Sequence, residues 1–474
     1  MKEKADLGIS LLNKKKFPEA KKVFSELIFE FSDHFYPRYL LGLLQIKTDD
    51  YRNALENLLV ALNLNYNHIP TYVDISFVYT KLKEYKKAED ILTKGLSLEN
   101  KNQQLKINLS YIYLVQGKME ELIKNDREIL KINPNNYYIL NRLDELKQPV
   151  LNKKLKSNLK REIKKKNITF ENKVYMNFLL ARYENNIGKI STEYEFLMKA
   201  HETIFLGNKK SFQDNNNLIF SKLRNIHQNY EKDIALKHLD LDTHELKPIF
   251  IFGLPRSGST ILEKIILNSN TKVVAGEETR FFNEIVETLY FDKYNGNIVE
   301  CFSNIKQKYL ELTNTNKLNT IFTDKSLNNF FFLGWIKLIF PKAKFINCNR
   351  DPSIIASSII RNNLSNLSWA HRLEDIKKYF DVYYDVLEKW SEKIDIDVYQ
   401  FHYDNLIKDF DSETRKILSF CDLKWNTDLI NFNKSKFVSQ TASNIKVREI
   451  FSREEDQKHI GMSNFIKKKF YKFN

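Results

Sequence analysis

The chain contains few cysteines, glycines and prolines. Among its 474 residues are 3 Cys, 12 Gly and 9 Pro. Cys301, Cys348 and Cys421 lie far apart and form no CxxC pair. This spacing argues against a disulfide framework and a zinc site, and it favours a reducing compartment. The small number of turn-forming residues is typical of a mostly helical protein.

Long apolar runs are also missing. No window approaches the roughly 18 consecutive apolar residues of a membrane span. The most apolar window, FFFLGWIKLIF, is interrupted by Lys337, and the opening residues MKEKADLGISLLNKKKF have no apolar signal core. These absences predict a cytoplasmic protein without a membrane span, and they leave a peripheral membrane contact open.

Positive charge is in excess, with a formal net charge of +15. Nucleic acid, an anionic membrane or an anionic small ligand would all suit this sign, and plain solubility explains it equally well. The basic stretch at residues 151–167, LNKKLKSNLKREIKKKN, is more often the solvated face of a helix than a binding site. Charge alone therefore selects no partner.

Residue types recur at a spacing of 34 positions in the first part of the chain. Aromatic or large apolar residues and small residues each keep this register: Phe17, Tyr51, Tyr85 and Met119; Ala20, Ala54, Ala88 and Leu122; Gly8, Gly42, Ser76 and Ser110. This period resembles the tetratricopeptide repeat, in which each unit is a helical hairpin with small residues where its helices meet. The resemblance implies a helical solenoid at residues 1–145. Its concave face would bind a peptide or another domain, or the solenoid would serve as a scaffold or dimer surface.

Residues 146–245 continue with helical periodicity and predict a helical extension that contains one degenerate hairpin. From Pro248 the pattern changes to strand, loop and helix. The expected strands are Ile249–Gly253, Lys272–Ala275, Thr320–Phe322, Lys344–Cys348 and Asp397–Phe401. Strands that alternate with helices predict a three-layer α/β domain with a parallel sheet at residues 246–474. Ligands of such sheets bind at the carboxyl ends of the strands.

The segment PIFIFGLPRSGSTILEKIILNS opens like a phosphate-binding loop between a strand and a helix. Ser259 and Thr260 stand where an ATP- or GTP-binding loop would have Lys followed by Ser or Thr, and Arg256 is the cation inside the loop. Gly258 permits close backbone approach, and the helix N-terminus favours an anion. An anion site built from Arg256, Ser257, Gly258, Ser259 and Thr260 is therefore expected, and a tight turn without a ligand is the alternative.

GLPRSGST followed by VVAGEETR resembles the sulfotransferase superfamily, in particular protein-tyrosine sulfotransferases and bacterial proteins that join tetratricopeptide repeats to a sulfotransferase domain. The resemblance covers about residues 246–455. It implies a P-loop-like fold that uses 3′-phosphoadenosine 5′-phosphosulfate (PAPS) as sulfuryl donor, with the loop at residues 256–260 around the 5′-phosphosulfate. A sulfuryl group carries less negative charge than a γ-phosphoryl group, so arginine and backbone donors can suffice and no metal is expected.

The resemblance also implies the catalytic residues. Glu278, the second Glu of GEETR, corresponds to the general base, although a glutamate there would also suit a helix start. Arg280 would help place an acidic acceptor peptide, and Lys325 would contact the transferring sulfate. Ser443 and Thr441, in SQTASNIKVREIF, are both candidates for the residue that contacts the sulfate from a closing loop.

The nucleotide-binding residues follow from the same resemblance. Arg350 and Ser358 match the pair that holds the 3′-phosphate, and arginine suits bidentate phosphate binding. Tyr403 matches a tyrosine that contacts the nucleotide. Asn349 stands where many bacterial relatives have a second Arg. His371 does not match the histidine base of the small-molecule sulfotransferases, so a structural role is expected.

The sequence therefore predicts a sulfotransferase that moves a sulfuryl group from PAPS to an acceptor hydroxyl, with a protein tyrosine as one candidate. A saccharide, a lipid head group or a small molecule remains open as acceptor. The repeats suit a protein partner or self-association, and no nucleic-acid partner is expected. The alternatives are a repeat scaffold with an inactive nucleotide-binding domain and an atypical P-loop kinase or NTPase. After Phe451 the sequence lacks the aromatic and basic pattern that the resemblance leads one to expect.

Overall fold

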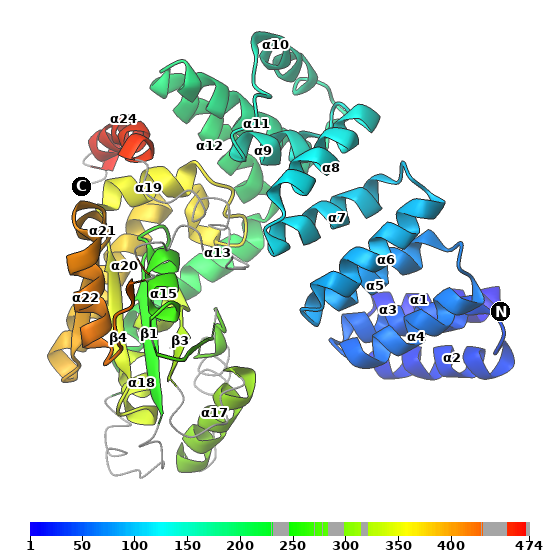
Figure 1. Cartoon of the computed structure of the whole chain (residues 1–474), viewed down its shortest axis with the longest axis horizontal. Helices are drawn as coiled ribbons and strands as arrows, with labels where there is room; N and C mark the ends of the chain where they lie inside the picture. Colours follow the sequence, from blue (N-terminus) through cyan, green and yellow to red (C-terminus); the bar gives the residue numbers. More distant parts are fainter. Residues whose placement is uncertain are drawn as a thin grey trace. The chain divides into compact units, whose positions relative to one another are not determined.

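The structure is a computed structural model that describes residues 1–228, 230, 246–269, 271–276, 278–282, 298–313, 321–427, 429 and 453–470. The chain divides into two compact units, of which the first holds Met1–Val150 and the second begins at Leu151. Figure 1 shows helices throughout the first unit, and helices with a parallel sheet in the second.

The first unit is a series of helical hairpins. Its helices are α1 Lys2–Asn13, α2 Phe17–Glu30, α3 Phe35–Lys47, α4 Tyr51–Leu64, α5 Ile69–Lys81, α6 Tyr85–Leu98, α7 Gln103–Gln116, α8 Met119–Ile132 and α9 Tyr137–Glu145. The residues of the first 34-residue register, Phe17, Tyr51, Tyr85 and Met119, are the first residues of α2, α4, α6 and α8. The predicted helical repeats are therefore confirmed.

The small-residue register lies where the two helices of a hairpin meet. A Cβ added to Gly42 of α3 would lie 2.7 Å from Leu58 Cγ of α4. A Cβ on Gly8 of α1 would lie 2.3 Å from Phe24 Cε1 of α2. Ser76 and Ser110 are buried at the equivalent positions. Close packing between the helices thus explains why these positions hold small residues.

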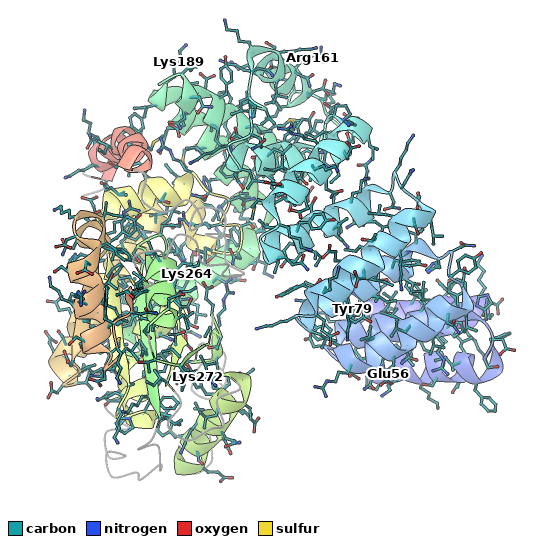
Figure 2. The ribbon with its side chains drawn as sticks, in the orientation of Figure 1. Glu56, Tyr79, Arg161, Lys189, Lys264 and Lys272 are labelled. Atoms are coloured by element: carbon teal, nitrogen blue, oxygen red, sulfur yellow. The ribbon has the colours of Figure 1, made fainter. Side chains whose placement is uncertain are left out.

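The second unit begins with helices α10 Lys153–Glu162, α11 Phe170–Asn186, α12 Ile190–Gly207 and α13 Lys209–Asn217. Helices α11 and α12 pack against each other as a hairpin. Some basic side chains of α10 are exposed, for example that of Arg161 (Figure 2). Others form ion pairs, for example Lys156, whose Nζ lies 2.8 Å from Glu184 Oε1. Phe178 and Ile204 of the hairpin belong to the same hydrophobic core as Trp335 and Phe345 of the α/β part.

The described strands are β1 Lys247–Gly253, β2 Val273–Ala275, β3 Ile321–Asp324, β4 Lys344–Asn349 and β5 Val398–His402. They form one sheet in the order β2-β3-β1-β4-β5, and every pairing is parallel. The predicted parallel α/β layout is therefore confirmed. Strand β3 extends beyond the predicted Phe322 because Thr323 and Asp324, although polar, are buried and hydrogen-bonded.

Helices cover both faces of this sheet (Figure 1). The helices of this part are α15 Ser259–Leu267, α17 Ile298–Thr313, α18 Leu333–Ile339, α19 Pro352–Ile360, α20 Leu373–Lys393, α21 Tyr403–Lys408, α22 Phe410–Phe420 and α24 Arg453–Phe470, of which α24 packs against α19. Side chains alternate across a strand. Ile249 and Ile251 of β1 pack with residues of α15 and α22, whereas Phe250 and Phe252 pack with residues of α18 and α20. Each face of the sheet is thus closed by its own hydrophobic core.

Within the described part of the chain, none of the helices combines the length and the apolar character needed to cross a membrane.

Two buried histidines connect the α11–α12 hairpin to the α/β part. His201 Nδ1 of α12 lies 3.0 Å from His371 Nδ1, and His201 Nε2 lies 2.8 Å from the carbonyl oxygen of Ile360. Because this carbonyl can only accept, His201 carries its proton on Nε2, and its Nδ1 accepts from His371 Nδ1. The His371 ring also stacks on Phe212, with centroids 5.1 Å apart. Burial lowers the pKa of His201 to about 4 and the pKa of His371 to about 3.

We expect this pair to make the second unit less stable in acid. The unfolded chain takes up protons on both rings near pH 6.5, whereas the folded chain takes them up only near pH 4 and pH 3. The free energy of unfolding should therefore be highest above about pH 6.5 and decrease as the pH falls from there. Denaturant unfolding at a series of pH values measures the slope. Ring NMR signals of His201 and His371 that titrate near pH 6.5 in the folded protein would contradict this expectation.

Candidate active site at the carboxyl edge of the sheet

The loop between β1 and α15 has an unusual backbone. Arg256 has φ +74° and Gly258 has φ +102°. Ser257 Oγ donates to the Leu254 carbonyl oxygen over 2.6 Å and closes the turn. A Cβ on Gly258 would lie 2.7 Å from Tyr403 Cδ2, so a side chain there would be strained and crowded. Successive N–H groups in such turns form concave anion sites, and α15 adds its N-terminus at Ser259.

Arg256 and Ser358 are in direct contact, although 102 residues separate them. Arg256 Nε donates to Ser358 Oγ over 3.0 Å. Ser358 is buried on α19, whose start is capped by Asp351, which accepts from the Ser353 and Ile354 N–H groups. The loop after β1 and the helix after β4 therefore meet at the predicted anion-binding residues.

Tyr403, at the start of α21, lies between two other predicted residues. The Arg350 guanidinium carbon is 4.3 Å from the centre of its ring, and the ring edge faces Gly258. A guanidinium that stacks on an aromatic ring is held in place by the cation–π attraction. Arg256, Gly258, Ser358, Arg350 and Tyr403 thus form one cluster that spans the ends of β1, β4 and β5.

Lys325, at the end of β3, is held between two carboxylates. Its Nζ donates to Glu278 Oε1 over 2.8 Å and lies 3.8 Å from Glu263 Oε2, and Lys325 is only 2% exposed. Burial lowers the pKa of Lys325, but Glu263 and Glu278 outweigh this effect and the pKa is raised. Burial also raises the pKa of Glu263, against the opposing effect of Lys325. The predicted base Glu278 and the predicted sulfate ligand Lys325 are therefore brought together as an ion pair.

Sequence reasoning missed Glu263 and Asp324. Glu263 is buried on α15 and accepts from Thr323 Oγ1 over 3.0 Å, and Asp324 is fully buried at the end of β3. Arg280 is exposed and has φ +50°, and its N–H donates to Ser326 Oγ over 3.0 Å. A signal for Asp324 was present, because TDKS places polar residues directly after an apolar strand.

The sequence also singles out Ser443, Thr441 and Asn349. Ser443 and Thr441 lie outside the described residues. Asn349 Nδ2 donates to Gln400 Oε1 of β5 over 2.9 Å, so this side chain links two strand ends. Among the residues that the structure describes, no group of three or more His, Cys, Asp or Glu side chains is arranged to hold a metal ion.

Comparisons with known proteins agree with both parts of the chain. Residues 248–427 match the sulfotransferase family, and residues 69–102, which hold α5 and α6, match a tetratricopeptide repeat. An uncharacterized protein of Aquifex aeolicus (strain VF5) is 28% identical over 230 residues, which make up 45% of this chain and 30% of the relative. The match thus spans less than a third of that protein.

Two solved structures are similar to part of the chain. MamA 41-end from Desulfovibrio magneticus RS-1 has 16% identity and a TM-score of 0.28, over 43% of this chain and 93% of its own. The tetratricopeptide-repeat protein TTC0263 of Thermus thermophilus has 15% identity and a TM-score of 0.27, over 43% of this chain and 90% of its own. On the family matches and its own fold, the chain joins tetratricopeptide repeats to a domain of the sulfotransferase family.

Proposed function

We propose that the second unit transfers a sulfuryl group from PAPS to an acceptor hydroxyl. The observation that carries this proposal is the hydrogen bond from Arg256 Nε to Ser358 Oγ. It joins the loop proposed for the 5′-phosphosulfate to the helix proposed for the 3′-phosphate. A ligand with two anionic groups would therefore meet the hydrogen-bond donors proposed for each group next to one another. The match of residues 248–427 to the sulfotransferase family supports the same chemistry.

The residues present fit such a donor molecule. The loop would offer the backbone N–H groups near Gly258 together with the hydroxyls of Ser259 and Thr260. Arg350, stacked on Tyr403, and Ser358 would hold the 3′-phosphate, which distinguishes PAPS from ATP. PAPS is strongly anionic, so the chain's net charge of +15 favours its approach.

In the proposed reaction the acceptor oxygen forms a bond to sulfur as the bond from sulfur to the 5′-phosphate oxygen breaks. The acceptor proton passes to the Glu278 carboxylate, and the leaving phosphate keeps the electron pair. Lys325 and Arg256 stabilise the charge that develops on the bridging and phosphate oxygens. Base and cation are suitably close, because Glu278 Oε1 and Lys325 Nζ lie 2.8 Å apart.

A protein tyrosine remains our proposed acceptor. A phenol has a pKa of about 10, so a carboxylate base must remove its proton as the bond to sulfur forms. The exposed Arg280 would attract an acidic peptide around that tyrosine. Tetratricopeptide repeats suggest protein interaction, and we propose that the first unit binds the acceptor or a partner protein. The low cysteine content supports a cytoplasmic location.

The first test is the choice of nucleotide. We expect 3′,5′-ADP to raise the melting temperature of the full chain, because a ligand that binds only the folded state stabilises it by about 2.7 kcal/mol at a hundredfold excess over Kd. Arg350→Ala should weaken this binding about tenfold to a hundredfold, because it removes charge-assisted hydrogen bonds. Thermal melts with 3′,5′-ADP and with magnesium and 5′-ADP measure both effects.

The control is Arg415→Ala, since Arg415 lies on α22 and pairs with Asp411. This variant should respond to 3′,5′-ADP like the wild type. If only magnesium with 5′-ADP raised the melting temperature, the sulfotransferase proposal would be overturned in favour of a kinase or NTPase.

The second test concerns the base. Glu278→Gln keeps an oxygen that can accept a hydrogen bond from Lys325, but the amide cannot act as a base. We therefore expect kcat with labelled PAPS to fall by about 10²- to 10⁴-fold. Binding of 3′,5′-ADP should change little. The matched control, Glu311→Gln, alters a glutamate at the exposed end of α17 and should leave kcat unchanged. Full activity of Glu278→Gln would remove Glu278 from the proposed mechanism.

A further inference from the structure

The loop that carries Glu278 is bonded to the end of β3 at each of three consecutive residues. Strands β2 and β3 run parallel and in register up to Ala275 opposite Thr323. Beyond this point residues 278–280 face residues 324–326. The three bonds join Lys325 Nζ to Glu278 Oε1 at 2.8 Å, Thr279 Oγ1 to Asp324 Oδ2 at 2.9 Å and the Arg280 N–H to Ser326 Oγ at 3.0 Å.

Asp324 is the fixed end of this arrangement. The residue is fully buried, and its carboxylate accepts four hydrogen bonds. The donors are Ser326 N at 2.7 Å, Asn329 Nδ2 at 3.1 Å, Tyr309 OH at 2.8 Å and Thr279 Oγ1 at 2.9 Å. A buried carboxylate is costly unless it is hydrogen-bonded, and four donors compensate both of its oxygens. The position of Asp324 is therefore determined by the interior, and Thr279 is the donor that belongs to the loop.

The loop needs such support because its own backbone does not favour the observed shape. Arg280 has φ +50°, which residues with a Cβ adopt at a cost of about 1 kcal/mol or more. Glu278 and Arg280 are exposed, whereas Thr279 between them is partly buried. The loop is thus held in this shape by its bonds to the end of β3, which involve Glu278, Thr279 and the Arg280 N–H.

We propose that Asp324, acting through Thr279, is a positioning residue for Glu278. This inference rests on the proposed function, in which Glu278 takes the acceptor proton. Neither Asp324 nor Thr279 would touch a substrate. Their bond fixes where the Glu278 carboxylate lies relative to the transferring group, and misplacement by about 1 Å can cost about a hundredfold in rate.

Two hydroxyls that donate to the same Asp324 oxygen allow a matched test. Thr279→Val removes the donor that belongs to the loop and keeps the side-chain shape. Tyr309→Phe removes a donor that belongs to α17 and leaves the loop untouched. Both variants take one hydrogen bond from Asp324 Oδ2, so a purely structural carboxylate would respond to them alike. Thr279→Ser restores the hydroxyl and serves as the conservative rescue.

We expect kcat of Thr279→Val to fall about tenfold to a hundredfold, with little change in the KM for PAPS, because the residues proposed for the 5′- and 3′-phosphates lie on the loop after β1 and on α19. Thr279→Ser should recover most of this loss, and kcat of Tyr309→Phe should fall by no more than about threefold. Hydrogen exchange gives a readout that needs no turnover. The Arg280 amide should exchange faster in Thr279→Val and at the wild-type rate in Tyr309→Phe.

The outcomes separate this inference from the proposed function. Equal kcat values for Thr279→Val and Tyr309→Phe, with an active wild type, would overturn the positioning role and leave the sulfotransferase proposal intact. Unchanged exchange of the Arg280 amide in Thr279→Val would overturn it as well. A wild-type chain without any PAPS-dependent turnover would overturn the proposed function, and the positioning role would fall with it.

Discussion

A buried ammonium group holds the candidate site together. Lys325 is almost fully buried, and a charge in such a place is tolerated only when opposite charges and hydrogen bonds compensate it. Glu263 and Glu278 provide that compensation from α15 and from the loop after β2. The lysine therefore links three parts of the sheet edge: helix α15, the end of β3 and the loop after β2 that carries the candidate base Glu278.

The sheet explains why these parts meet. All its pairings are parallel, so the carboxyl ends of β1, β3, β4 and β5 lie at one edge, where the candidate residues gather. Apolar residues fill both faces of β1, and the candidate site residues follow where the strands end. Thr323 and Asp324 continue β3 as polar residues in a buried position, and each forms a hydrogen bond with a partner distant in sequence.

Local patterns made much of the fold predictable. The 34-residue register located the starts of four helices, and the apolar run before LPRSGST located the end of β1, whereas β3 ends two residues beyond its predicted end at Phe322. Pairings between distant residues could not be predicted in this way. Burial of Glu263 and Asp324 depends on partners that tertiary contacts supply, and a charged residue inside a helix normally indicates an exposed face. The contact between His201 and His371 spans 170 residues, and no local periodicity encodes it.

The α11–α12 hairpin contributes to the site through α19, the helix proposed for the 3′-phosphate. At its first turn α19 is capped by Asp351, and in its last turn Ser358 accepts from Arg256. Just beyond that end, Arg361 donates to both carboxylate oxygens of Glu193 on α12, over 2.7 and 2.9 Å, and His201 bonds the carbonyl of Ile360. Bidentate contacts of this kind fix orientation as well as distance. A helix held at both ends keeps Ser358 in place without a ligand, so a phosphate would meet donors that are already ordered, and little of its binding energy would be needed to arrange them.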